Sequence, residues 1–487
     1  MFEATYLGWQ GWQLASARTR LLVDPLLVDE VGNGPRGRRL NFHFWPPRSF
    51  NLTALPPIDA VFLTHEHEDH FSVASLARID RAIPIWLSAR SSRAARTLLA
   101  EMGFAVRLVA PDATLRLGDL EVCLFGPDHV GPFPNNEWDT LAYAVRDAHG
   151  DGAFFTNVDV DVTDAARTMV NEWAGRGARQ VLLFEGMEVA LAPAAEVGRR
   201  LEAHELHAPG RDTPFCEGSS PAGLHRGGRF RPLAGQSFRF EAGALRRIDG
   251  SPFLRTPPRE TWPPRPRFRR TPAEPFEPFC GTHAFDDADW PELAAGLARL
   301  AEHLYGHYLF RRLYSLDASA LAGRKPTFVW VLRLDAEGGA YALEYDPTGC
   351  AFEPTDLPAD LEDFRYAGVA TCWATDLLAL LRGEFEARAI VKGFHEAWHP
   401  SCPLVSLLSD VLWEYFHPLR HPEVTLRRYR TTAAAEAGAP LHVRAAQAAA
   451  SLQEARAASA EAGHPGRAAG EEAGHRGLAT QAEASGS

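Results

Sequence analysis

Short apolar runs alternate with segments of helical periodicity through residues 1–190. Runs bounded by Gly, Pro or Asp predict partly buried strands, and they lie at 20–23, 60–64, 83–87, 106–109, 121–125, 153–157 and 180–184. Between them, periodic apolar positions predict helices at 72–81, 91–102 and 163–174. This order is typical of an α/β fold in which helices and sheets form layers, and it disfavours a helical bundle.

A second folding unit is predicted after a stretch rich in Pro, Gly and Arg. Residues 208–275 cannot supply a continuous core, so we expect a linker there. Leucines then recur at steps of four, three and four, which predicts an amphipathic helix through Leu293, Leu297, Leu300 and Leu304. Later apolar runs predict antiparallel strands at 327–334, 340–345 and 367–372, with a helix at 375–382 packed on them. The second unit is therefore expected to be α+β.

The end of the chain has a composition that disfavours folding. From Thr431 onward, Ala, Glu, Gly and Ser dominate, and such a segment buries too little apolar surface to offset its ordering entropy. We therefore divide the chain into four expected segments: an α/β domain over 1–255, a Pro/Arg-rich linker over 256–277, an α+β domain over 278–428 and an Ala-rich disordered tail over 429–487.

Composition excludes several classes of protein. The 487 residues are 46% apolar and 23% charged, as in folded globular proteins, and the formal charge of −12 argues against a nucleic-acid partner. The six cysteines are scattered and never approach the C-x-x-C spacing of a zinc knot or a disulfide framework. No signal peptide is recognisable, and no apolar run approaches the roughly 20 residues of a membrane span. These features predict a cytoplasmic protein with reduced thiols.

The strongest chemical signal is the sequence Thr-His-Glu-His-Glu-Asp-His at 64–70, which directly follows an apolar run. Three imidazoles and three carboxylates within six residues crowd like charges and leave imidazoles to be desolvated. A divalent metal relieves both problems, because neutral imidazole and carboxylate are its natural ligands. The loop therefore predicts a metal site at the end of a strand.

The pattern His65-x-His67-x-Asp69-His70 resembles the signature of the metallo-β-lactamase-fold superfamily. Further runs carry the same resemblance, and they are Tyr-Leu-Gly-Trp-Gln-Gly at 6–11, Leu-Leu-Val-Asp-Pro at 21–25, Asp-Thr-Leu-Ala-Tyr at 139–143 and Phe-Phe-Thr-Asn-Val-Asp at 154–159. The resemblance implies a four-layer αββα sandwich for residues 1–190, extending to about 255. The run Leu-Thr-His-Glu-His-Glu-Asp-His-Phe-Ser at 63–72 is similar to the ascorbate-phosphate-lactonase and sialic-acid-hydroxylase-like branch.

The resemblance also implies a set of metal ligands. One ion is held by His65, His67 and a third histidine, for which we choose His129; Asp69 and His70 begin a second site. For the bridging carboxylate we choose Asp159, with Asp161 as the alternative. The last ligand of the second site is His204, His207 or His225, or is absent. Asp24 is expected to support the ligand loop through hydrogen bonds, or else to be an ordinary Asp-Pro turn.

Such a site predicts hydrolysis. A zinc-class ion lowers the pKa of bound water from 15.7 to about 7 and so supplies hydroxide at neutral pH. Asp69 would orient the water and return a proton to the leaving group. We therefore expect a hydrolase with one or two Zn²⁺ ions, with iron or manganese as alternatives, and a small-molecule ester, lactone or phosphodiester as substrate.

The sequence also permits two other functions. The hydroxylase resemblance permits an iron-dependent oxidative enzyme on the same fold. The C-terminal segment resembles sterol-carrier-like modules, so the chain could instead bind an apolar ligand or partner, with the metal site structural. Its candidate cleft residues are Trp373, Leu377, Leu381 and Trp398, although aromatics and leucines at these spacings are more often plain core.

Two further histidine patterns predict no metal site. His395-Glu-Ala-Trp-His399 matches H-E-x-x-H, but Pro400 follows at once and disfavours the helix that this motif needs. A polar loop after a strand is expected there. His303 and His307 are four residues apart on the leucine-patterned helix without carboxylates nearby, and we interpret them as partly exposed helix histidines.

Overall fold

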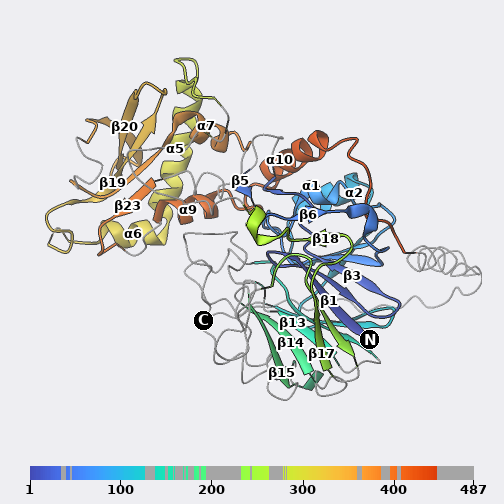
Figure 1. Ribbon diagram of the computed structural model, residues 1–487. Coiled ribbons are helices and arrows are strands. Elements are labelled where there is room, and N and C mark those ends of the chain that lie inside the picture. Colours follow the sequence, from blue (N-terminus) through green and yellow to red (C-terminus); the bar gives the residue numbers. More distant parts are fainter. Residues whose placement is uncertain are drawn as a thin grey trace, which may run out of the picture.

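The computed structural model describes most of both folding units. The described residues are 1–33, 40–43, 46–126, 138–148, 152–156, 158, 168, 170, 172–173, 180–185, 188–193, 232–241, 244–262, 278, 280, 282–317, 319–358, 365–384, 395–402 and 407–446. Figure 1 shows a larger N-terminal unit built on two sheets and a smaller unit beside it that contains α5, α7 and β19–β23.

The N-terminal unit contains an eight-stranded sheet in the order β17-β16-β1-β2-β3-β7-β8-β9. Its strands are β1 Phe2–Gly8, β2 Gly11–Ala15, β3 Arg20–Val23, β7 Ala60–Leu63, β8 Ile85–Ser88, β9 Val106–Val109, β16 Ser237–Glu241 and β17 Ala244–Ile248. Strands β3, β7, β8 and β9 run parallel to one another. The carboxyl ends of β3 and β7 therefore lie side by side, and each is followed by a candidate site residue.

A six-stranded sheet in the order β10-β11-β12-β13-β14-β15 faces the first sheet. Its strands are β10 Thr114–Leu117, β11 Leu120–Phe125, β12 Ala142–Asp147, β13 Gly152–Thr156, β14 Gln180–Glu185 and β15 Glu188–Pro193. Side chains from both sheets form one core, in which Trp12 of β2 contacts Phe154 of β13 and Phe184 of β14 at ring-centroid distances of 4.7 and 5.0 Å. Two short pairs complete the unit, β4 Glu30–Val31 with β5 Leu40–His43 and β6 Ser49–Phe50 with β18 Leu254–Arg255.

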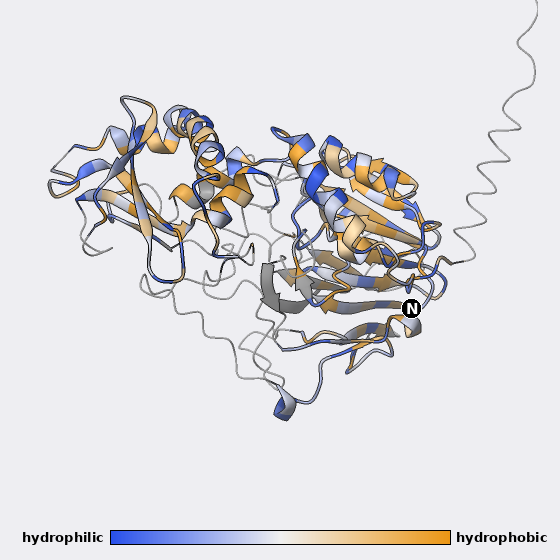
Figure 2. Ribbon diagram, turned by 90° about the horizontal axis from the view of Figure 1, so that it is seen from above, coloured by the Kyte–Doolittle hydropathy of each residue, from blue (hydrophilic) through white to orange (hydrophobic). Residues whose placement is uncertain are grey.

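Three helices cover the outer face of the eight-stranded sheet: α1 Val73–Leu76, α2 Arg93–Glu101 and α10 Pro422–Ala435. Ser72 and Ser92 cap α1 and α2 by accepting hydrogen bonds from backbone amides of the first turn. Figure 2 shows hydrophilic and hydrophobic residues side by side on the helices, as expected where one face packs on a sheet. The described layers agree with the expected α/β sandwich. The expected linker at 208–275 is wrong for β16 and β17, which lie in the eight-stranded sheet and bring Phe238 and Phe240 into its core. The expected helix at 163–174 lies mostly outside the described residues.

Helix α10 comes from the far end of the chain, and it returns to the N-terminal unit (Figure 1). Tyr429 is fully buried and its ring lies 5.1 Å from that of Phe71. Beyond the helix, Val443 and Ala445 pair with Ile79 and Ile58 in isolated parallel bridges. The last described part of the chain is therefore a layer of the first unit.

This arrangement corrects the expectation that disorder begins at residue 429. The segment 422–446 is ordered because a few apolar side chains, with Tyr429 and Val443 both fully buried, are enough once the sheet and α2 supply the rest of the core. Small residues such as Ala433 pack closely in that setting. Residues 447–487 lie outside the described part of the chain.

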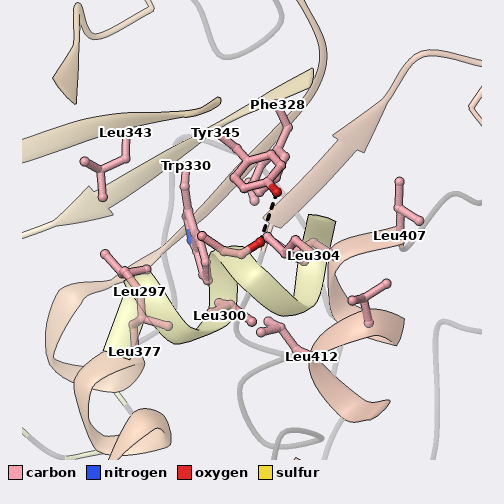
Figure 3. Packing of buried hydrophobic residues seen from close by; sticks show 14 of the residues in the cluster. Leu297, Leu300, Leu304, Phe328, Trp330, Leu343, Tyr345, Leu377, Leu407 and Leu412 are labelled. Carbon is pink, nitrogen blue, oxygen red and sulfur yellow. Dashed lines mark hydrogen bonds between the residues drawn. The ribbon is translucent and has the colours of Figure 1, made fainter. Parts of the chain in front are cut away.

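The smaller unit is a five-stranded sheet packed by helices, as expected for an α+β domain. Its elements are α5 Trp290–Gly306, α6 Tyr308–Tyr314, β19 Lys325–Arg333, β20 Ala340–Asp346, β21 Ala351–Thr355, β22 Tyr366–Trp373, α7 Ala374–Leu381, β23 His395–Trp398 and α9 Leu407–Tyr415. Figure 3 shows the leucines of α5 against Trp330 and Tyr345, whose hydroxyl donates to the Ala301 carbonyl oxygen at 3.0 Å. The predicted leucine-patterned helix is thus confirmed, with all four leucines buried.

The structure of this unit tests three expectations. Strand β22 pairs with β19 in parallel, although these strands were expected to be antiparallel. The H-E-x-x-H segment is the strand β23, which pairs with β22, so the zincin helix is excluded and the expected loop is wrong. The candidate cleft residues Leu377, Leu381 and Trp398 belong to the packed cluster around α5, so they are core rather than a cleft. None of the helices in the described segments is long and apolar enough to cross a membrane.

Replacing Tyr429 by Ala should destabilise the N-terminal unit by about 3 kcal/mol, because the ring is fully buried and its removal leaves a cavity against Phe71. Urea unfolding measures this loss. The matched control is Tyr305→Ala on α5, where the side chain is 51% exposed and truncation should change little. Equal stability of the two variants would show that the C-terminal return is not part of this core.

Candidate metal centre

The His-rich loop runs from the end of β7 to the start of α1, and its ionisable side chains are all buried. The loop turns at His67, whose carbonyl oxygen accepts hydrogen bonds from the amides of His70 at 2.8 Å and Phe71 at 2.6 Å. Each of the residues 65–70 is at most 3% exposed. Buried charges and imidazoles at this density require partners, so the contacts inside the loop decide what it can hold.

Asp24 is the main partner of the loop. It follows β3 with a φ of 42°, and its Oδ1 accepts from the Thr64 amide at 2.8 Å while its Oδ2 accepts from the Thr64 hydroxyl at 2.6 Å. The Oδ2 atom also lies 2.8 Å from Nδ1 of His70. Gly11 permits this approach, because a Cβ there would lie 2.9 Å from the Asp24 carbonyl oxygen. Asp24 therefore joins the two ends of the loop.

These contacts set the tautomers of two histidines. A carboxylate only accepts, so Nδ1 of His70 carries a proton, and in the neutral imidazole Nε2 then keeps its lone pair. The Thr64 hydroxyl donates to Asp24, so its oxygen accepts from Nδ1 of His65, 3.0 Å away. His65 consequently also presents an unprotonated Nε2. An acid or hydroxyl behind each imidazole is the arrangement that metal-binding histidines require.

The nitrogen and oxygen atoms of the loop that could bind a metal ion lie close to one another. Nε2 of His65 lies 3.0 Å from Nδ1 of His67, and the rings of His65 and His70 have centroids 3.8 Å apart. Oδ2 of Asp69 lies 3.9 Å from Nε2 of His70. Two imidazole nitrogens that face each other at this distance, with a carboxylate and a third imidazole beside them, fit the ligand chemistry of a divalent cation.

The loop supplies only part of each expected ligand set. Within the described residues, no group of three or more His, Cys, Asp or Glu side chains is arranged to hold an ion. The remaining candidates all lie outside the described residues, and they are His129, Asp159, Asp161, His204, His207 and His225. Their part in the site therefore stays a prediction.

A pair of buried acids was missed by the sequence analysis. Glu66 accepts a hydrogen bond from the Ser92 amide at the N-terminus of α2, and Oδ2 of Asp139 accepts from the Ser91 hydroxyl at 2.7 Å. Burial raises the pKa of Asp139 well above its usual range, and the Glu66 carboxylate raises it further. Asp139 precedes strand β12, but no sequence signal places it beside Glu66, because the two residues lie far apart in the chain.

A small cavity adjoins the loop, and we call it the Trp413 cavity. It has a volume of about 30 Å³ and is lined by Glu66, His67, Glu68, Trp138, Trp413, Phe416, Pro418, Arg428 and Tyr429. The Trp413 ring of α9 stands edge-on to the His67 ring with centroids 5.1 Å apart, and Trp138 contacts His417 at 4.1 Å. Residues after 412 thus form one wall of the candidate site, although the sequence predicts that they belong to a separate domain and a tail.

Asp139→Asn should make the stability of the N-terminal unit less dependent on pH. A carboxyl with a raised folded-state pKa contributes stability fully below its unfolded pKa, and this contribution is lost as pH rises toward the folded value. The amide keeps an acceptor for Ser91 without the charge, so the variant should gain stability at neutral pH. Urea unfolding from about pH 4 to about pH 8 tests this, with the exposed Asp112→Asn as control. Parallel pH profiles for wild type and Asp139→Asn would contradict the assignment.

The match to one family model agrees with the architecture of the N-terminal unit. Residues 19–194 match the family model described as a beta-lactamase superfamily domain. No curated protein matches the chain.

Solved structures also match the chain at low identity. An isothiocyanate hydrolase from Delia radicum gut bacteria is 18% identical, with 38% of this chain and 72% of that chain covered and a TM-score of 0.31. A possible metal-dependent hydrolase from Veillonella parvula is 18% identical over 39% and 73%, with a TM-score of 0.29. CmlA, a diiron β-hydroxylase from Streptomyces venezuelae, is 22% identical over 42% and 40%, with a TM-score of 0.27. With the two facing sheets and the His-rich loop, the family match identifies residues 19–194 of this chain as a β-lactamase superfamily domain.

Proposed function

We propose that this chain is a metal-dependent hydrolase that acts on a small-molecule ester, lactone or phosphodiester. The observation that carries the proposal is the approach of His65 Nε2 to His67 Nδ1 within 3.0 Å in a fully buried loop. In this proposal residues 1–255 form the catalytic domain, 256–277 a linker and 278–428 an accessory domain, except that α10, which begins at Pro422, packs on the catalytic domain. The proposed ligands are His65, His67 and His129 for one ion, with Asp69, His70 and Asp159 for a second.

The hydrogen bonds around the loop support these roles. Asp24 and Thr64 hold His65 and His70 in the tautomers that leave Nε2 available, so neither imidazole needs to reorganise on binding. Asp24 itself is held behind the ligands and would not touch the ion. Preorganised ligands of this kind lower the cost of forming the site.

A bound divalent cation, with zinc as our first choice, would activate water and polarise the carbonyl or phosphoryl oxygen of the substrate. Asp69 is the residue that we expect to handle the proton. Its carboxylate would orient the attacking water, take a proton from it and give that proton to the leaving group. Its near-complete burial, at 3% exposed, favours such a role because bulk water competes little with the carboxylate.

Purified protein should contain about one divalent ion or more per chain, and His65→Ala/His67→Ala should lose it. Inductively coupled plasma mass spectrometry measures the metal content and names the element. The matched control is His395→Ala/His399→Ala, which removes the first residue of β23 and the residue directly after it, and leaves the loop unchanged. A wild type without metal, or a loop variant that keeps it, would refute the proposed site.

The same measurement separates zinc from iron. Zinc in protein from cells supplied with both metals, together with hydrolysis of ester, lactone or phosphodiester substrates, supports the hydrolase. Iron as the bound element would instead favour an oxidative enzyme on this fold.

A further inference from the structure

The Trp413 cavity contains an acid that the metal proposal does not use. Glu68 is 1% exposed and lines the cavity, and neither of its carboxylate oxygens accepts a hydrogen bond from a described residue. A buried carboxylate without donors is unfavourable, so such a group is retained where something else supplies the donors. Glu68 lies between His67 and Asp69, but its oxygens have none of the contacts to described residues that hold the neighbouring side chains.

The other walls of the cavity are aromatic. Trp138 comes from the N-terminal unit, Trp413 and Phe416 come from α9 and the turn after it, and Tyr429 comes from α10. Aromatic faces around a carboxylate are the surroundings that stabilise an organic cation, because the ring quadrupole attracts positive charge where water is excluded.

The charges on the wall favour a cation over an anion. Two carboxylates, Glu66 and Glu68, line the cavity against one guanidinium, that of Arg428. The Arg428 guanidinium lies 5.7 Å over the ring of Tyr429, so part of its charge is already directed at that ring. The volume of about 30 Å³ has room for about two water molecules, so it admits an ammonium group and not a whole substrate.

We propose that the Trp413 cavity binds a protonated primary amine of the substrate, with Glu68 pairing with the ammonium group and Trp413 flanking it. This inference rests on the proposed hydrolase site, because His67 belongs to both the cavity lining and the ligand loop. The substrate class is then an ester, lactone or phosphodiester that carries an alkylamine. Residues of the C-terminal part of the chain would thus determine specificity at a site that the N-terminal domain builds.

Binding of small probes tests the inference without turnover. n-Butylammonium, n-butanol and n-butyrate have similar apolar chains and differ in charge, and calorimetry on the full chain compares their affinities, before and after treatment with a chelator. We expect n-butylammonium to bind at least about tenfold more tightly than n-butanol or n-butyrate, because neither of these can form the desolvated charge pair with Glu68. Equal affinities, or a preference for butyrate through Arg428, would overturn the inference.

Glu68→Gln gives a matched test, because it removes the charge and keeps the shape. It should weaken n-butylammonium binding at least about tenfold, whereas the exposed Glu423→Gln on α10 should leave it unchanged. Glu68→Gln should also unfold at a temperature no lower than wild type, because it removes a buried charge that has no donor among the described residues. A lower unfolding temperature with unchanged amine affinity would show that Glu68 is structural.

A variant outside the loop tests the aromatic wall, and its metal content is measured because Trp413 also contacts the proposed ligand His67. Trp413→Leu on α9 removes the aromatic face and should weaken n-butylammonium binding several-fold while leaving the metal content unchanged. Comparison of p-nitrophenyl 4-aminobutyrate with p-nitrophenyl pentanoate then relates binding to catalysis through the ratio of their KM values. Absence of turnover on both esters would count against the hydrolase proposal, while the probe affinities would still decide the amine site.

Discussion

The candidate site depends on one buried carboxylate. Asp24 accepts hydrogen bonds from the amide and the hydroxyl of Thr64 at one end of the His-rich loop, and its Oδ2 contacts Nδ1 of His70 at the other end. The Thr64 hydroxyl donates to Asp24, so its oxygen is left to accept from Nδ1 of His65. A single acid therefore sets the orientation of two imidazoles. Buried charge at this density is costly unless partners offset it, so the hydrogen bonds of Asp24 stabilise the loop as well as orienting its imidazoles.

The neighbouring parallel strands explain why Asp24 is available. β3 and β7 pair through Leu21 with Ala60 and Leu22 with Val61, which places the residues after each strand at one edge of the sheet. In parallel sheets this edge gathers the residues that follow the strands, and ligand sites commonly occur there. The register of β3 and β7 therefore brings Asp24 to the His-rich loop, although Asp24 and Thr64 lie 40 positions apart in the chain.

The C-terminal part of the chain changes how the site should be understood. α9 belongs to the packed core of the smaller unit, yet Trp413 on it reaches the His67 ring. The following segment then crosses to the N-terminal unit, where Tyr429 and Val443 enter the core beneath α1 and α2. An ion-paired group secures the crossing, because Glu414 contacts both His307 Nε2 at 2.7 Å and Arg420 Nη2 at 2.9 Å. Burial lowers the pKa of the adjacent His303 to about 4, which keeps it neutral beside Arg420.

The sequence by itself determined the local elements and the ligand-rich loop. Apolar runs at 20–23 and 106–109 coincide with β3 and β9. The leucine period places α5, because burial on one face of a helix imposes a pattern that is visible locally. The tertiary structure decided everything that joins distant segments: the hydrogen bonds of Asp24, the pairing of Glu66 with Asp139, the parallel register of β22 and the return of 422–446. Long-range packing leaves no period in the sequence, because a residue such as Tyr429 is buried by partners more than 300 positions away, as the contact with Phe71 shows.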